Sequence, residues 1–259
     1  MQEDAPQIIY FFNDITLDQM NHIEDISQEH LSAIIEQSYI QISELFISNT
    51  VVNLEYNQLV QHLISSLEND ISYYSHVILV GNKGADLFER IKKYIKYDKL
   101  VLININRVFL TDLSDGFECE YNYDVSSNIN TTDNRILIVD DIVYTGETIK
   151  KVIDLLKLGN KNLTVASLIV FKDFVDSVSS IHSGYYIDKY SWPIDNVELW
   201  CFKDFIEKRS LNIKGKQSSS FIDDKFFCEK YVFGEHYDCA KSIVEKTRYE
   251  LANHLGHDY

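Results

Sequence analysis

Two adjacent carboxylates and a threonine-glycine turn are the residues of this chain best suited to chemistry. Asp140 and Asp141 follow the apolar run Ile136–Val139, and the turn Thr145-Gly146-Glu147-Thr148 begins four residues after Asp141. A turn that opens a helix after a buried strand offers backbone N–H groups and a helix dipole to a phosphate, and glycine allows close approach. Paired carboxylates suit sugar hydroxyls or a hydrated Mg²⁺. The segment therefore predicts a ribose 5-phosphate site; the alternative is a plain strand and capped helix, in which Asp141 and Thr145 satisfy only backbone groups.

The elements around this segment predict the domain that must position it. Continuous apolar runs that alternate with helical patterns indicate a parallel sheet covered on both faces, so we predict an α/β fold with a doubly wound, mainly parallel sheet. Residues 107–134 are polar and predict a long loop or a mobile hairpin. The expected strands are residues 77–80, 100–103, 136–139 and 163–171, and the expected helices are residues 85–95, 147–158 and 237–255.

Composition and periodicity divide the chain into three expected parts. Residues 1–70 form an acidic, mainly helical N-terminal extension, because apolar side chains recur at helical spacing from residue 16 onward. Residues 71–195 form the core with a hood segment, and residues 196–259 form a small, irregular C-terminal appendage.

Charge is distributed unevenly along the chain. The formal net charge is −16, and residues 1–70 hold twelve acidic residues but no Lys or Arg. Nucleic-acid binding depends on Lys and Arg side chains that neutralise phosphates, so this charge argues against nucleic acid as a partner. The acidic region is interpreted as a solvated face, with a docking surface for a basic protein partner as the alternative.

Two further features bound the cellular setting. No apolar run approaches the roughly 20 residues that span a bilayer, so no membrane association is expected. The four cysteines show no CxxC spacing, which favours free thiols over a zinc site or a disulfide framework. We therefore expect a cytoplasmic protein.

Residues 136–148 resemble the phosphoribosyl-pyrophosphate (PRPP) signature of the type I phosphoribosyltransferases. The resemblance implies that Asp140 and Asp141 hold the ribose hydroxyls, and Mg²⁺ through water or those hydroxyls. It also implies that the 5-phosphate is bound by the five consecutive residues Tyr144, Thr145, Gly146, Glu147 and Thr148.

Two other stretches are similar to the hypoxanthine-guanine branch of that family. Val80–Ala85 resembles its pyrophosphate loop, which implies that Lys83 and Gly84 face pyrophosphate; a plain turn is the alternative. The segment 186–193 resembles its hood, where an aromatic ring stacks on the base. Tyr190 and Trp192 are the candidates for that contact, with buried aromatic packing as the alternative for each.

The resemblance implies a Mg²⁺-dependent transfer of ribose 5-phosphate from PRPP to a nucleobase or related heterocycle. Asp140, Asp141 and Lys83 would be the catalytic residues, and Arg107 is a further candidate for pyrophosphate, unless it is a surface arginine. Tyr144 stands where purine-salvage members commonly carry an Asp, and it resembles the pyrimidine-operon attenuator branch, which has uracil phosphoribosyltransferase activity. The acceptor base therefore stays open.

Two other functions remain alternatives. One is a nucleotide-sensing regulatory protein that keeps the pocket with little turnover, and the other is a component of a larger assembly. A homodimer is compatible with each of these interpretations.

Overall fold

The computed structural model describes a large part of the chain. The described residues are 8–13, 28–46, 50–70, 72–108, 118–122, 135–144, 146–158, 162–171, 178–187, 194–195, 225, 228–229 and 233–254. They divide into two compact units, one formed by residues 57–189 and the other by residues 1–56 together with 190–259.

The unit of residues 57–189 is built on a seven-stranded sheet in the order β5-β4-β3-β6-β8-β7, with β9 also paired to β8. All pairs are parallel except β4 with β5. The strands are β3 (Tyr73–Val80), β4 (Lys96–Val108), β5 (Glu118–Asn122), β6 (Ile136–Val139), β7 (Ile142–Val143), β8 (Leu163–Phe171) and β9 (Ser180–Ile187). The predicted mainly parallel sheet is confirmed.

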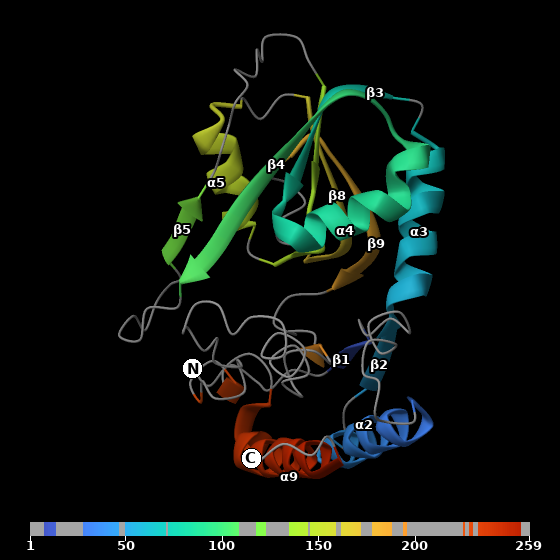
Figure 1. Cartoon of the computed structure of the whole chain (residues 1–259), viewed down its shortest axis with the longest axis vertical. Coiled ribbons are helices and arrows are strands. Elements are labelled where there is room, and N and C mark those ends of the chain that lie inside the picture. The colour runs from blue at the N-terminus through green and yellow to red at the C-terminus, as the bar shows by residue number, and fades with distance from the viewer. Residues whose placement is uncertain are drawn as a thin grey trace. The chain divides into compact units, whose positions relative to one another are not determined.

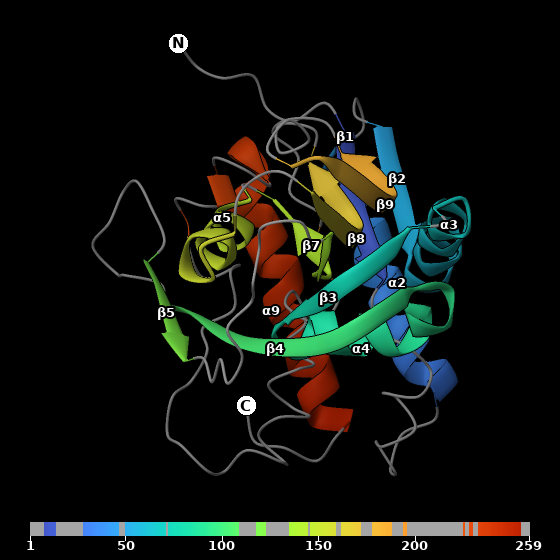
Figure 2. The ribbon, with the colours of Figure 1, turned by 90° about the horizontal axis from the view of Figure 1, so that it is seen from above.

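Helices cover both faces of this sheet. The helix α5 (Glu147–Leu155) lies on one face, and α3 (Tyr56–Glu68) and α4 (Gly81–Ile91) lie on the other (Figures 1 and 2). A short 3₁₀ turn, η1 (Lys92–Tyr94), follows α4. Residues of β6 and β8 are buried throughout, which explains why both read as unbroken apolar runs.

The core under α5 consists of aliphatic side chains from the helix and from the strands. Ile149 and Val152 of α5 pack in one cluster with residues of five strands, including Ile78, Ile138 and Val165. Both α4 and α5 begin directly beyond strands that run parallel, so their N-termini lie at the carboxyl edge of the sheet. That edge is where ligands bind in open α/β sheets.

Several sequence-based boundaries need correction. The helical interpretation of residues 16–70 is wrong for residues 50–55, which form a strand. The expected strand 100–103 is the middle of a longer strand, because its polar second half pairs with β5. For the stretch 107–134 the structure shows the start of a hairpin, and its remaining residues lie outside the described part.

The other unit has a small sheet of its own, in which β1 lies between β2 and β10 and all pairs are parallel. The helices α2 and α9 pack against each other, and a hydrogen bond between Ser38 and Thr247 (Oγ–Oγ1 2.6 Å) is buried between them. Its elements are β1 (Ile8–Asn13), α2 (Gln28–Glu44), β2 (Thr50–Glu55), β10 (Ile194–Asp195), η4 (Gly234–His236) and α9 (Tyr237–His254). Within the described chain, no helix is long and apolar enough to cross a membrane.

Candidate functional site

The diacid lies at a break between two short strands. Val139 pairs with Ala166 and Ile142 pairs with Ile169, so β6 and β7 follow the same edge of β8 in one register. Asp140 and Asp141 occupy the interruption, at the carboxyl edge of the sheet. Because β8 continues unbroken beside them, the turn that carries both carboxylates is supported along its length.

Main-chain contacts fix this turn. The N–H of Asp140 donates to the carbonyl of Ala166 (3.1 Å), and the carbonyl of Asp141 accepts from the N–H of Leu168 (3.0 Å). The N–H of Asp141 donates to Oδ1 of Asp140 (3.0 Å). Asp140 is only 5% exposed, and Asp141 is half-buried. One carboxylate is therefore held inside the turn, while the other is more open to a ligand.

The turn after β7 leads into α5 through a left-handed glycine. Gly146 has φ +71°, a conformation that a side chain would strain, and it stands immediately before α5. Thr148 is buried in the first turn of the helix, whereas Glu147 is exposed. The ring of Tyr144 packs edge-on against Phe171, at 4.2 Å between centroids. This geometry suits a phosphate at the helix N-terminus, with Glu147 directed to solvent.

The expected pyrophosphate loop is the first turn of a helix. Residues Gly81–Ile91 form α4, so the expectation of a loop or plain turn at residues 80–85 is wrong from Gly81 onward. Gly84 lies against the end of β6: a methyl group on it would lie 2.5 Å from the carbonyl oxygen of Val139 and 3.6 Å from Cα of Asp140. Lys83 is exposed beside it. The structure thus brings Gly84, the second residue of the predicted Lys83-Gly84 pair, next to the diacid.

Other predicted site residues fall beyond what the structure describes. Thr145, Tyr190 and Trp192 lie outside the described residues, as does the side chain of Arg107. The backbone of Arg107 lies in β4, opposite Cys119 of β5.

The site offers few protein ligands for a metal. Among the described residues, no group of three or more His, Cys, Asp or Glu side chains could enclose a metal ion. Mg²⁺ usually keeps several waters and uses one or two carboxylates together with substrate phosphates. Asp140 and Asp141 are two carboxylates of the kind that this mode of binding uses.

Comparison with known sequences identifies this region. Residues 55–173 match the family model of the phosphoribosyl transferase domain. This part of the chain is a phosphoribosyltransferase domain. The match runs from the last residue of β2 to just beyond β8 and includes the diacid, so the family that the motif resembles is confirmed. None of the curated proteins compared with the chain matches it significantly.

Solved structures are similar to about half of the chain. A purine phosphoribosyltransferase from Pyrococcus horikoshii Ot3 is 21% identical, over 55% of this chain and 90% of its own, with a TM-score of 0.36. A hypoxanthine phosphoribosyltransferase from Staphylococcus aureus is 17% identical, over 51% of this chain and 74% of its own, with a TM-score of 0.38. A hypothetical protein from Neisseria gonorrhoeae with bound ppGpp is 14% identical, over 54% of this chain and 84% of its own, with a TM-score of 0.41. With TM-scores this low, the assignment of the family rests on the family model.

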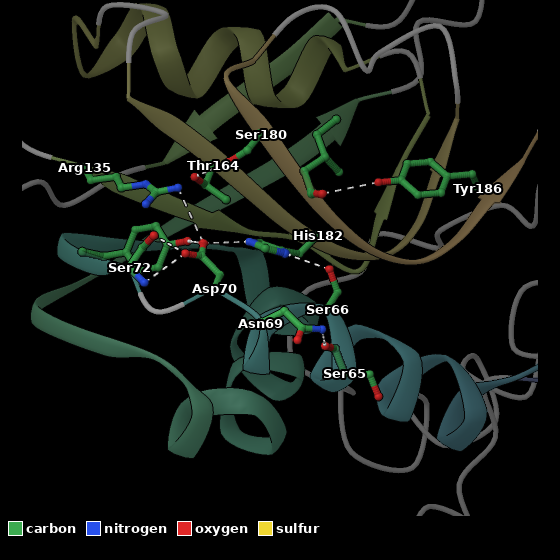
Figure 3. A network of polar contacts seen from close by, with 12 residues as sticks. Ser65, Ser66, Asn69, Asp70, Ser72, Arg135, Thr164, Ser180, His182 and Tyr186 are labelled. Atoms are coloured by element: carbon green, nitrogen blue, oxygen red, sulfur yellow. Dashed lines mark hydrogen bonds and ion pairs between the residues drawn. The ribbon is translucent and has the colours of Figure 1, made fainter.

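The phosphoribosyltransferase domain also contains a polar network that the sequence analysis missed (Figure 3). Asp70 accepts hydrogen bonds from the N–H and hydroxyl of Ser72, from Tyr74 (2.7 Å) and from Nε2 of His182 (3.0 Å), and Arg135 lies 3.6 Å away. These contacts join the ends of the strands opposite to the diacid. Ser72 and Tyr74 are neighbours of Asp70 in the sequence, but His182 lies 112 positions away, and so distant a partner leaves no local pattern by which the network could have been found.

One part of this network resembles a catalytic triad in composition only. Nδ1 of His182 lies 2.8 Å from Oγ of Ser66, and Nε2 contacts Asp70. Ser66 lies in the last turn of α3, where a helix presents carbonyl groups rather than free N–H groups, so the described end of this helix does not offer the backbone donors that an oxyanion needs. The network is therefore structural.

Titration in the network follows from its contacts. Although burial alone would raise it, hydrogen bonds from Ser72, Tyr74 and His182 hold the pKa of Asp70 well below its usual range. Burial, followed by the hydrogen bond to Asp70, raises the pKa of Tyr74 to about 12. Asp70 is therefore ionised and Tyr74 neutral at neutral pH.

Proposed function

We propose that the domain transfers ribose 5-phosphate from PRPP to a nucleobase or related heterocycle and releases pyrophosphate. One observation carries the proposal: the Lys83-Gly84 turn of α4 lies against the end of β6, where Asp140 begins the diacid turn. A phosphate-binding helix start, paired carboxylates and an exposed lysine then share one edge of the sheet. These are the groups that a sugar with phosphates at both ends requires.

Each side chain has a role in this proposal. Asp140 and Asp141 bind the ribose hydroxyls, and the segment Tyr144–Thr148 binds the 5-phosphate through backbone N–H groups and hydroxyls. Lys83 neutralises charge on the departing pyrophosphate. Mg²⁺, which Asp140 and Asp141 would hold through water or the ribose hydroxyls, would supply further positive charge there. As the C–O bond to pyrophosphate breaks, positive charge develops on the ribose ring, and the nearby carboxylates stabilise it.

For the acceptor, we propose a flat heterocycle that stacks on Tyr190 or Trp192. Tyr144, whose ring packs edge-on against Phe171, stands at the position at which purine-salvage relatives carry an acid. This supports the attenuator-like interpretation of the motif, in which the general base comes from elsewhere.

Several expectations about the setting of the protein are also proposals. The chain would act in the cytoplasm, because its four cysteines lack CxxC spacing and are expected to be free thiols, which a reducing compartment maintains. A homodimer and a basic partner for the acidic residues 1–70 would complete the assembly, and the charge of that region supports the second. Residues 196–259, which belong to the same unit as residues 1–56, would be a C-terminal appendage outside the transferase core.

The test is a pyrophosphate-release assay with PRPP, Mg²⁺ and a panel of purine and pyrimidine bases. We expect release with at least one base, and a loss of about 100-fold or more in Asp141→Asn, because the neutral amide cannot stabilise developing positive charge. The matched control is Asp154→Asn, an exposed aspartate on α5, which should leave turnover unchanged. No release with any base, despite measurable PRPP binding, would replace the transferase with a nucleotide-sensing protein.

A further inference from the structure

Ser167 is a buried hydroxyl beside the diacid turn, in the otherwise apolar second half of β8. Its side chain is 0% exposed, and Oγ lies 2.8 Å from the carbonyl oxygen of Asp141 and 3.0 Å from that of Ile169. A buried hydroxyl without a partner costs free energy, so these contacts explain how the strand accommodates it. The Ile169 contact is local to the strand, whereas the Asp141 contact reaches the site.

The carbonyl of Asp141 is the point at which β8 anchors the turn. It accepts from the N–H of Leu168 (3.0 Å) and from the N–H of Ile169 (3.3 Å), in addition to the Ser167 hydroxyl. The two N–H donors belong to the strand itself and are present whatever side chain stands there. Ser167 is the one donor of the three that depends on residue type.

Orientation of this carbonyl determines where the carboxylates lie. The peptide that precedes Asp141 donates its N–H to Oδ1 of Asp140, and the peptide that follows it presents the anchored carbonyl. A rotation of the Asp141 backbone would therefore move both acids. Only these two residues interrupt the line from β6 to β7, and they are tied to β8 by the N–H of Asp140 and the carbonyl of Asp141.

We propose that Ser167 is a positioning residue, whose hydroxyl fixes the Asp141 backbone and thereby aims the two carboxylates at the ribose of PRPP. The identity of the ligand rests on the proposed function. The support of the turn by Ser167 is a property of the protein without ligand.

The test compares Ser167→Ala with Thr164→Ala. Thr164 stands in the same strand, is 1% exposed, and shares a hydrogen bond of 2.7 Å with Ser180 at the opposite end from the diacid. Each variant loses one buried hydroxyl from β8, so a general loss of stability is common to both. Only Ser167→Ala removes a contact to the site.

The first readout is the dissociation constant of PRPP with Mg²⁺, measured by calorimetry. We expect Ser167→Ala to weaken binding about tenfold, as is usual for residues that orient a ligand-binding group. Thr164→Ala should remain within about twofold of the wild type, because its site is distant. Inorganic phosphate, which needs only the segment Tyr144–Thr148, should bind equally to all three proteins. Equal PRPP affinity in the two variants would overturn the proposal.

The second readout is hydrogen exchange of the unliganded protein. In Ser167→Ala the amides of Asp141, Leu168 and Ile169 should exchange faster than in Thr164→Ala, because the turn has lost a donor. A wild-type protein that binds no PRPP would refute the proposed function, and exchange would still decide the role of Ser167. Unchanged exchange at these three amides would reject that role in either case.

Discussion

At the scale of single residues, Gly84 determines how closely α4 approaches the diacid. A methyl group there would lie 2.5 Å from the carbonyl oxygen of Val139, a main-chain atom that cannot rotate away. We expect Gly84→Ala to lower the free energy of unfolding by about 1–3 kcal/mol, the usual cost of overpacking, as measured by urea denaturation. Asn82→Ala, at an exposed position in the same turn, should change it by less than about 0.5 kcal/mol. Equal stability of the two variants would show that α4 does not contact β6 this closely.

Among the single residues, those that form a continuous motif could be proposed from the sequence. Asp140, Asp141 and Gly146 could be named because their types and spacing carry the information. Ser167 could not, because a serine in an apolar strand has no local signature, and its partner is 26 positions away in the chain.

At the scale of elements, the central strands were easy to predict because both of their faces are buried. Strands that depend on pairing with distant segments of the chain were hard to predict. The runs Ile136–Val139 and Leu163–Phe171 match β6 and β8 because their apolar side chains are continuous. Thr50–Glu55 lies between two helices, and its strand character depends on pairing with Ile8–Asn13, which no local pattern shows. The polar half of β4 is likewise stabilised by β5 rather than by burial of apolar residues.

The polar network at the amino edge makes the strand ends sensitive to alkali. The pKa of Tyr74 is raised to about 12, above the value of about 10 in an unfolded chain. The neutral Tyr74 hydroxyl therefore stabilises the folded state fully below pH 10, and this stabilisation is lost as the pH rises toward 12. We expect the free energy of unfolding, measured in urea, to fall between pH 10 and 11, and to fall less steeply in Tyr74→Phe. Tyr249→Phe, at an exposed tyrosine, should retain the steep fall; an equally steep fall in Tyr74→Phe would contradict this role for Tyr74.

At the scale of the whole molecule, the two ends of the chain contribute to one unit and the middle forms the other. Residues 57–189 hold the seven-stranded sheet, and residues 1–56 with 190–259 hold a second sheet and the packed pair α2 and α9. Each unit has a core of its own, so each has the means to unfold as a cooperative element. Parallel pairing of β1 with both β2 and β10 is what joins the chain ends, and it spans too much sequence to be predicted from periodicity.

This division predicts two thermal transitions, of which PRPP stabilises only one. PRPP at about 100 times its dissociation constant should add about 2.7 kcal/mol to the unit that binds it, residues 57–189. Thr247→Ala removes the buried contact to Ser38 in the other unit, costs about 1 kcal/mol, and should lower only the second transition, by roughly 3–6 °C. Scanning calorimetry with and without PRPP and Mg²⁺ measures both shifts. A single transition that both PRPP and Thr247→Ala displace would contradict this prediction, because it would mean that the two units unfold together.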